Sequence, residues 1–119
     1  MEFAILFYID ESTFGDFTES DHQRLQDVCR KEDAALERQG RLLMARALDA
    51  PARAVTVSLR QSKVTRTDGP FAETKEHLGG FIIVRADSME EAVAIAQGME
   101  LARHGKVEVR PAYDIRATL

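Results

Sequence analysis

The stretch EFAILFYID, residues 2–10, decides the fold of this chain. Successive side chains of a strand point to opposite faces, so Phe3 and Ile5 lie on one face and Leu6 lies on the other. Both faces are therefore apolar, which is typical of a central strand covered on both sides. The segment GGFIIVRA, residues 79–86, has the same pattern. Two central strands are predicted.

Length and composition limit the class of protein. The 119 residues are 45% hydrophobic and contain no repeat or linker, so we expect a single domain over residues 1–119. The net charge of −4 argues against a nucleic-acid partner, because polyanion-binding surfaces need an excess of Lys and Arg. The N-terminal apolar run is too short to span a membrane and lacks the basic start of a signal peptide. We expect a cytoplasmic protein without membrane contact.

Two helices are predicted from their capping signals. The first opens with Ser20 and Gln23 at capping-box spacing and closes at Gly40. The second repeats the capping box at Ser88 and Glu91. The single cysteine, Cys29, fits the first helix as a small apolar packing residue, with no second cysteine to pair with.

The remaining strands give the order of the fold. Strands are predicted at residues 41–48, 79–86 and 106–115, and a separate hairpin is predicted from residues 53–66 with its tight turn at Gln61 and Ser62. The order is strand, helix, strand, extra hairpin, strand, helix, strand. This is an α+β protein with the split β-α-β arrangement of ferredoxin-like folds and an added β-hairpin.

The two helices leave one face of the sheet uncovered. Right-handed crossovers place both helices on the same side. Burial of apolar surface contributes about 25 cal/mol per Å2. Leaving several apolar side chains on the other side exposed to solvent would therefore cost several kcal/mol, comparable with the stability of a small domain. We therefore predict a homodimer whose two sheets pack face to face, with an exposed apolar patch as the alternative.

The loop after the hairpin has an unusual sequence. Asp68 favours a turn, Gly69 permits unusual dihedral angles, Pro70 fixes its own φ, and Phe71 is expected to anchor the loop in an apolar pocket. A helical turn is predicted for AETKEHL, residues 72–78. A rigid loop of this kind suits ligand binding or catalysis, and it equally suits bracing of a dimer.

These segments carry a resemblance to a known family. The run TDGPFAETKEHLGGF, the helix DSMEEAVAIA and the terminal KVEVRP resemble the DGPF-domain branch of the YCII-related family over nearly the whole chain. The resemblance implies a dimeric α+β barrel of ferredoxin-like protomers. It also implies an enzyme with a characteristic His and Asp, although the activity of the family is unsettled, and a link of some members to extracytoplasmic-function sigma factor regulation.

His22 is the first candidate for that histidine. It lies three residues before Leu25 and seven before Cys29, on the stripe of the helix that points toward the sheet. The alternative is a structural histidine at the edge of the core. Asp68 is the candidate acidic partner and Asp10, at the end of the first strand, is the second choice; either carboxylate would orient the imidazole.

The other polar residues give weaker signals. His77 and His104 are expected to be solvated surface residues. The histidines have no metal-ligand spacing, so no metal site is predicted, and no nucleotide or cofactor motif occurs. Arg46 and Arg110 lie in strands with apolar neighbours, where interstrand ion pairs are expected and anion binding is the alternative.

Two functions remain open from the sequence. The first is a cofactor-free small-molecule enzyme of lyase, isomerase or hydrolase type, with His22 as base, Asp68 orienting it, and Gly69, Pro70 and Phe71 shaping the pocket. The second is a non-catalytic ligand-binding or regulatory dimer, for example a partner in sigma factor regulation. Whether the protein is an enzyme is left undecided.

Overall fold

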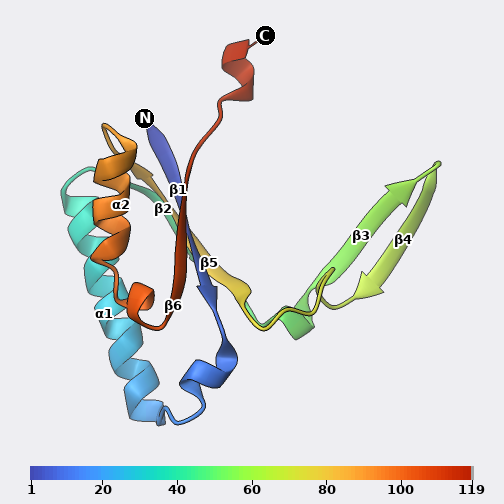
Figure 1. Cartoon of the computed structure of the whole chain (residues 1–119), viewed down its shortest axis with the longest axis horizontal. Coiled ribbons are helices and arrows are strands. Elements are labelled where there is room, and N and C mark those ends of the chain that lie inside the picture. Colours follow the sequence, from blue (N-terminus) through green and yellow to red (C-terminus); the bar gives the residue numbers. More distant parts are fainter. Residues whose placement is uncertain (119) are drawn as a thin grey trace.

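The computed structural model describes residues 1–118, with side chains through residue 116. Four strands form one antiparallel sheet in the order β2-β5-β1-β6, and two further strands form a separate hairpin (Figure 1). The elements are β1 (Glu2–Ile9), α1 (Glu19–Arg38), β2 (Leu42–Ala47), β3 (Val55–Arg60), β4 (Lys63–Asp68), β5 (His77–Arg85), α2 (Met89–Gln97) and β6 (Gly105–Pro111). This topology confirms the ferredoxin-like α+β fold with an added hairpin.

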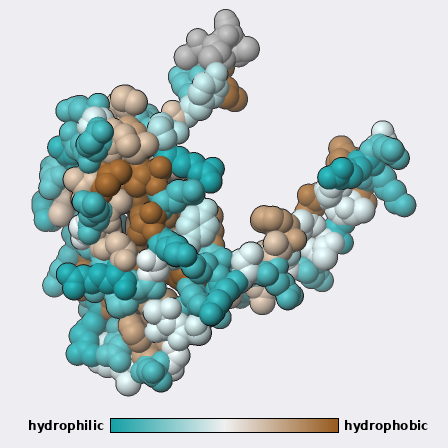
Figure 2. Space-filling model, viewed as in Figure 1, coloured by the Kyte–Doolittle hydropathy of each residue, from teal (hydrophilic) through white to brown (hydrophobic). Residues whose placement is uncertain are grey.

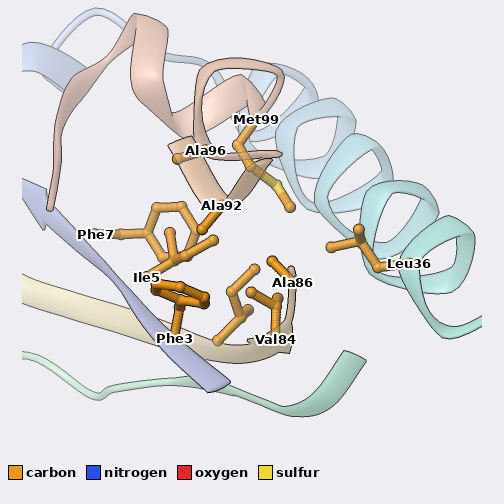
Figure 3. Close-up of a cluster of buried hydrophobic side chains, with 10 residues drawn as sticks. Phe3, Ile5, Phe7, Leu36, Val84, Ala86, Ala92, Ala96 and Met99 are labelled. Carbon is orange, nitrogen blue, oxygen red and sulfur yellow. The ribbon is translucent and has the colours of Figure 1, made fainter. Parts of the chain in front are cut away.

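The core lies between the helices and one face of the sheet, which we call the inner face (Figure 3). Phe3, Ile5 and Val84 are almost completely buried there. Each such side chain contributes roughly 1.5–3 kcal/mol by leaving water. The other core residues are Phe7, Leu36, Ile82, Ala86, Ala92, Ala96 and Met99. Small alanines on α2 let this helix lie close to the strands.

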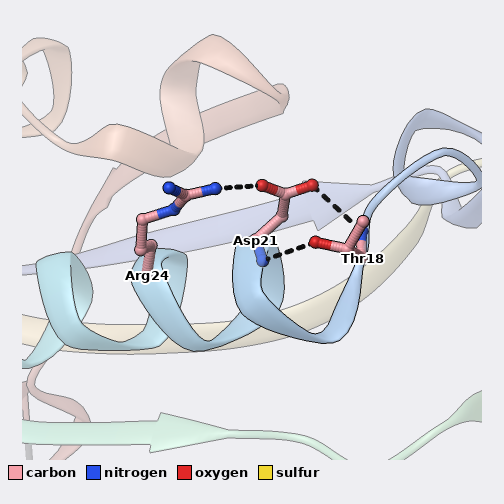
Figure 4. Close-up of polar contacts among 3 residues, drawn as sticks. All are labelled: Thr18, Asp21 and Arg24. Carbon is pink, nitrogen blue, oxygen red and sulfur yellow. Dashed lines mark hydrogen bonds and ion pairs between the residues drawn. The ribbon is translucent and has the colours of Figure 1, made fainter.

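The first helix begins two residues earlier than its sequence suggests. Thr18 is the N-cap: its Oγ1 accepts the Asp21 N–H at 3.1 Å, and Asp21 Oδ2 accepts the Thr18 N–H at 3.0 Å (Figure 4). The prediction of a capping box at Ser20 and Gln23 was therefore wrong. Thr18 and Asp21 have the same three-residue spacing, and the shorter acid closes the box in place of a glutamate.

The other helix boundaries follow the sequence signals. Gly40 has φ +72°, and the Arg41 N–H bonds to the Leu36 carbonyl, so the chain leaves α1 through a left-handed residue. At α2 the Ser88 hydroxyl oxygen accepts the Glu91 N–H. Both predicted boundaries are confirmed, but the capping box predicted at Ser88 and Glu91 is only half formed, because the Glu91 carboxylate pairs with Arg41. No helix among the described residues is long and apolar enough to cross a membrane.

The opposite face of the sheet, which we call the outer face, is apolar along its two central strands. Leu6 pairs with Phe81 and Ala4 pairs with Ile83, and all four residues are half-buried. Figure 1 shows both helices on the inner side of the sheet and neither on the outer side. The apolar character predicted for both faces of the central strands is thus present, and neither α1 nor α2 covers the outer face.

The added hairpin projects from the body as an isolated arm, residues 55–68 (Figure 1). Gln61 and Ser62 form its tight turn, with φ values of 51° and 64°. Positive φ at both central residues is the type I′ geometry, whose twist matches that of paired strands. The predicted hairpin and its turn are confirmed. Every residue of β4 is exposed.

The loop between β4 and β5 differs from its prediction in two ways. Residues 71–76 form bends, and β5 already begins at His77, so the helical turn predicted for residues 72–78 was wrong. Phe71 is 90% exposed and fills no apolar pocket of its own chain. The start of the loop is nevertheless well held. The Gly69 N–H donates to the Ala54 carbonyl at 2.7 Å, and Gly69 has φ +101°, a value that favours glycine.

Candidate functional site

A cavity of about 590 Å3 opens between α1 and the sheet. It is lined by parts of α1, by the end of β1, by β2 and by the start of β5. Its apolar lining consists of Phe7, Ile9, Phe14, Leu25, Ala45, Ala47, Phe81, Ile82, Met99 and Leu101. The volume lies in the range of small-molecule sites, which are mostly apolar with few polar groups.

The cavity exists because α1 does not pack flush on the sheet. Leu36 is the one buried residue of its twenty. Along the side of α1 that lines the cavity, His22, Gln26, Cys29 and Asp33 follow one another at spacings of four, three and four residues; His22 and Gln26 are exposed, and Cys29 and Asp33 are half-buried. These positions share one side of a helix, and in a solid core they would be apolar. The polar residues on this side of the helix are the sequence signal for this site.

Sequence reasoning found His22 and missed two carboxyl groups that line the same cavity about three helical turns further along α1. Glu32 and Asp33 both line the cavity. Burial raises the pKa of Asp33, and burial is also the main cause that raises the pKa of Glu32. The Glu100 N–H donates to Glu32 Oε2 at 2.8 Å, which lowers the pKa of Glu32 and partly opposes the effect of burial.

Cys29 lies half-buried in the same wall. Burial, and after it the carboxylates of Glu32, Asp33 and Glu100, raise the pKa of its thiol from 9.0 to about 11. A thiol of this kind is protonated at neutral pH, and the neutral thiol is a poor nucleophile. This environment agrees with the packing role predicted from the sequence.

The imidazole of His22 lies in a cluster of aromatic rings at the edge of the cavity. Its ring centroid is 5.4 Å from that of Phe17 and 6.3 Å from that of Phe14. His104 joins the same cluster, 5.8 Å from Phe14, and its Nε2 lies 3.4 Å from Glu100 Oε1. His104 is half-buried, so its prediction as a solvated surface residue was wrong. Its ring contacts come from segments far apart in the sequence.

Asp68, Gly69, Pro70 and Phe71 lie elsewhere in the chain. Asp68 ends β4, is exposed, and pairs with Val55 across the arm. None of these four residues lines the cavity that contains His22. Within one chain the structure therefore does not bring Asp68 and His22 into a common pocket.

Asp10, the second candidate acid, has different neighbours. It lies in a shallower hollow of about 480 Å3 with Ser12, Lys75 and His77. Hydrogen bonds from Ser12 are the main cause that lowers the pKa of Asp10, with smaller contributions from Lys75 and His77. His77 is half-buried at the start of β5, so its prediction as a solvated surface residue was wrong.

The two strand arginines have no interstrand ion pairs among the described residues. Arg110 pairs with Glu108 of its own strand at 3.0 Å. Arg46 donates to the carbonyl of Ala45 and lines the cavity. The predicted ion pairs between strands were therefore wrong; Arg46 pairs with Phe81 across the strands, so its side chain lies on the outer side of the sheet. Among the residues with described side chains, no group of three or more His, Cys, Asp and Glu could hold a metal ion.

Comparison with known proteins agrees with this fold. The model of the YCII-related domain matches residues 1–116. The chain belongs to the YCII-related family. This YCII-related protein is also 32% identical over 114 residues to an uncharacterised protein of Rhizobium meliloti (strain 1021). The match covers 93% of this chain and 91% of that protein. The DGPF run of this YCII-related protein, residues 68–71, lies at the base of the arm.

Proposed function

We propose that this YCII-related protein binds a small molecule in the cavity beside α1 and performs acid–base chemistry on it, with His22 as base and Asp33 or Glu32 as acid. The observation that carries the proposal is the grouping of an imidazole and two carboxyl groups of raised pKa in one largely apolar cavity. Groups with perturbed pKa values in a concave site are typical of acid–base catalysts.

The cavity also limits the class of ligand. Its apolar walls suit a molecule with a hydrocarbon or aromatic body. A raised pKa favours the protonated carboxyl group, which donates a hydrogen bond to a carbonyl or hydroxyl oxygen. The imidazole of His22, which lines the same cavity, is the proton acceptor in this proposal. A lyase, isomerase or hydrolase step on such a molecule needs no cofactor in this arrangement.

The test begins with ligand discovery. A metabolite library is screened by thermal shift, because a ligand that binds the native state raises the apparent stability. For a hit that is converted, His22→Ala is expected to lower kcat about 100-fold or more with the fold unchanged. His77→Ala is the matched control, since His77 lies outside the cavity and its change leaves kcat unaltered. Equal effects of the two substitutions would contradict the proposal.

Ligand binding without turnover is the second candidate function, and one observation favours it. Among the described residues, the His22 side chain has ring contacts with Phe14 and Phe17 and no hydrogen bond to a carboxylate. A catalytic imidazole is usually oriented by such a bond. If a hit binds and is recovered unchanged, and His22→Ala weakens its binding, the regulatory or binding function is supported.

We also propose that the protein is a homodimer of the DGPF type, built by packing the outer faces of two sheets. The apolar outer face supports this, because a symmetric partner presents the same apolar strands and removes both from water. The predicted role of Asp68, Gly69, Pro70 and Phe71 in the site stays a prediction. It requires a dimer in which the loop of a second copy approaches the cavity, since these residues do not line the cavity of their own chain.

A further inference from the structure

One face of the arm carries three exposed apolar side chains together with Arg66. Leu59 pairs with Val64, and Val57 pairs with Arg66, so the side chains of these pairs point to the same side of the hairpin. Val57, Leu59 and Val64 are 65%, 65% and 64% exposed. The other side of the hairpin carries only hydroxyl and charged side chains between Thr56 and Thr67. A hairpin with one apolar and one polar face usually packs its apolar face against another apolar surface.

The isolated position of the arm needs explanation. A single two-stranded hairpin is at best marginally stable in water. The arm nevertheless forms a regular ladder from Val55–Asp68 to Arg60–Lys63. It expands the molecule to a radius of gyration of 16.6 Å, where about 13.5 Å is usual for this length. Among the described residues, none covers the apolar face.

The direction of the arm shows what kind of partner fits. Figure 1 shows the helices on one side of the four-stranded sheet and the arm on the other, which is the side of the outer face. Figure 2 shows open space between the arm and the body. The two uncovered apolar surfaces of the chain are therefore on the same side. A second copy docked on the outer face would lie next to the arm as well.

The charge of the arm fits a second copy. The arm contains Arg60, Lys63 and Arg66, and its one acid is Asp68 at the base. Residues 55–67 hold three of the 16 Lys and Arg residues and none of the 20 Asp and Glu residues, so they carry +3 and leave −7 on the remainder of the chain. The body of another copy thus attracts the arm.

We propose that the arm is an exchange arm: in the homodimer each copy lays the face formed by Val57, Leu59 and Val64 on the body of the other copy. The inference rests on the homodimer proposed above and goes beyond packing of the two sheets. The exchange is reciprocal, because a two-fold axis relates the arms. It explains why an apolar hairpin is formed where its own chain offers no cover.

The first experiment measures dimer affinity by sedimentation equilibrium. Leu59→Asp places a charge on the apolar face and is expected to raise the dissociation constant about tenfold or more. Ser58→Asp is the matched control, because it adds the same charge at the neighbouring position, on the opposite face of the exposed strand β3. It is expected to change the constant less than about threefold. Equal constants for both variants and the parent protein would overturn the inference.

The second experiment identifies what the arm touches. Gln61→Cys in a Cys29→Ser background carries a benzophenone label at the tip of the arm, and the label is activated by light. Reciprocal exchange predicts a covalent product of twice the chain mass. A dimer whose label reacts only within its own chain would overturn the exchange arm and leave the sheet-to-sheet dimer standing. A parent protein that is monomeric at micromolar concentration would remove both proposals.

Discussion

At the scale of single residues, the wall of the cavity shows how neighbours set the chemistry of a side chain. Cys29 lies on α1, one turn before Asp33. The negative charges of Glu32 and Asp33 both act on its thiol. Withdrawal from water and nearby negative charge both disfavour the thiolate. The same withdrawal from water makes Asp33 a weaker acid. One half-buried stretch of α1 thus holds a protonated thiol together with two carboxyl groups whose pKa is raised.

Cys29 is therefore expected to react slowly with iodoacetamide. With a pKa of about 11 in place of 9.0, the thiolate fraction at pH 8 falls about 100-fold, and the rate falls with it. The rate should climb as the pH rises toward 11. The same chain in urea, where burial is lost, is the control and should react at the usual rate of a free thiol. Equal rates in the native and unfolded chain would contradict the assigned environment.

At the scale of elements, α1 depends on its first turn. The reciprocal bonds between Thr18 and Asp21 satisfy two backbone N–H groups that have no partner inside the helix. The bond from the Thr18 N–H to the Asp21 carboxylate is the largest cause that lowers the pKa of Asp21, and the hydrogen bond from Arg24 comes next. A lowered pKa means that the ionised group stabilises the fold above its unfolded pKa near 3.8. The contribution of Asp21 is lost as the pH falls through its lower folded value.

The cap gives a comparison between two neighbouring hydroxyl residues. Thr18→Ala is expected to lower the free energy of unfolding by about 1 kcal/mol in urea titrations at pH 7. Ser20→Ala is the matched control and should leave it within about 0.5 kcal/mol, because Ser20 lies inside the helix at an exposed position. A larger loss of stability for Ser20→Ala than for Thr18→Ala would show that Thr18 is not the N-cap.

At the scale of the whole molecule, two apolar surfaces on one side of the chain are left uncovered by the residues that the structure describes. The outer face exposes the apolar centre of the sheet, and the arm exposes Val57, Leu59 and Val64. Burial of both by one partner removes more apolar area from water than either contact alone. Folding of the arm and association are then linked, since an isolated hairpin gains little by forming alone.

Linkage to association makes the stability depend on concentration. The apparent melting temperature is expected to rise by several degrees between about 1 and 100 µM protein, because mass action favours the associated native state. Differential scanning fluorimetry over that range measures it. The Leu59→Asp variant should show a lower melting temperature at the low end of the range. A melting temperature independent of concentration would contradict a folded state that relies on a second copy.

The sequence by itself determined the order of elements. The apolar faces of residues 2–10 and 79–86, the cap at Ser88 and the exit at Gly40 depend on neighbours close in the chain. The periods of strand and helix report such local patterns directly. The turn at Gln61 and Ser62 was predicted in the same way. The error at Ser20 arose because Thr18–Asp21 and Ser20–Gln23 have the same three-residue spacing.

Only the tertiary structure decided the site. His22 was found from the stripe of its helix, whereas Glu32 and Asp33 gain their raised pKa values from burial against a sheet formed by distant segments. The separation of Asp68 from His22 depends on the direction in which the arm leaves the body. Such directions and burials come from the packing of the whole chain, and no local pattern encodes them.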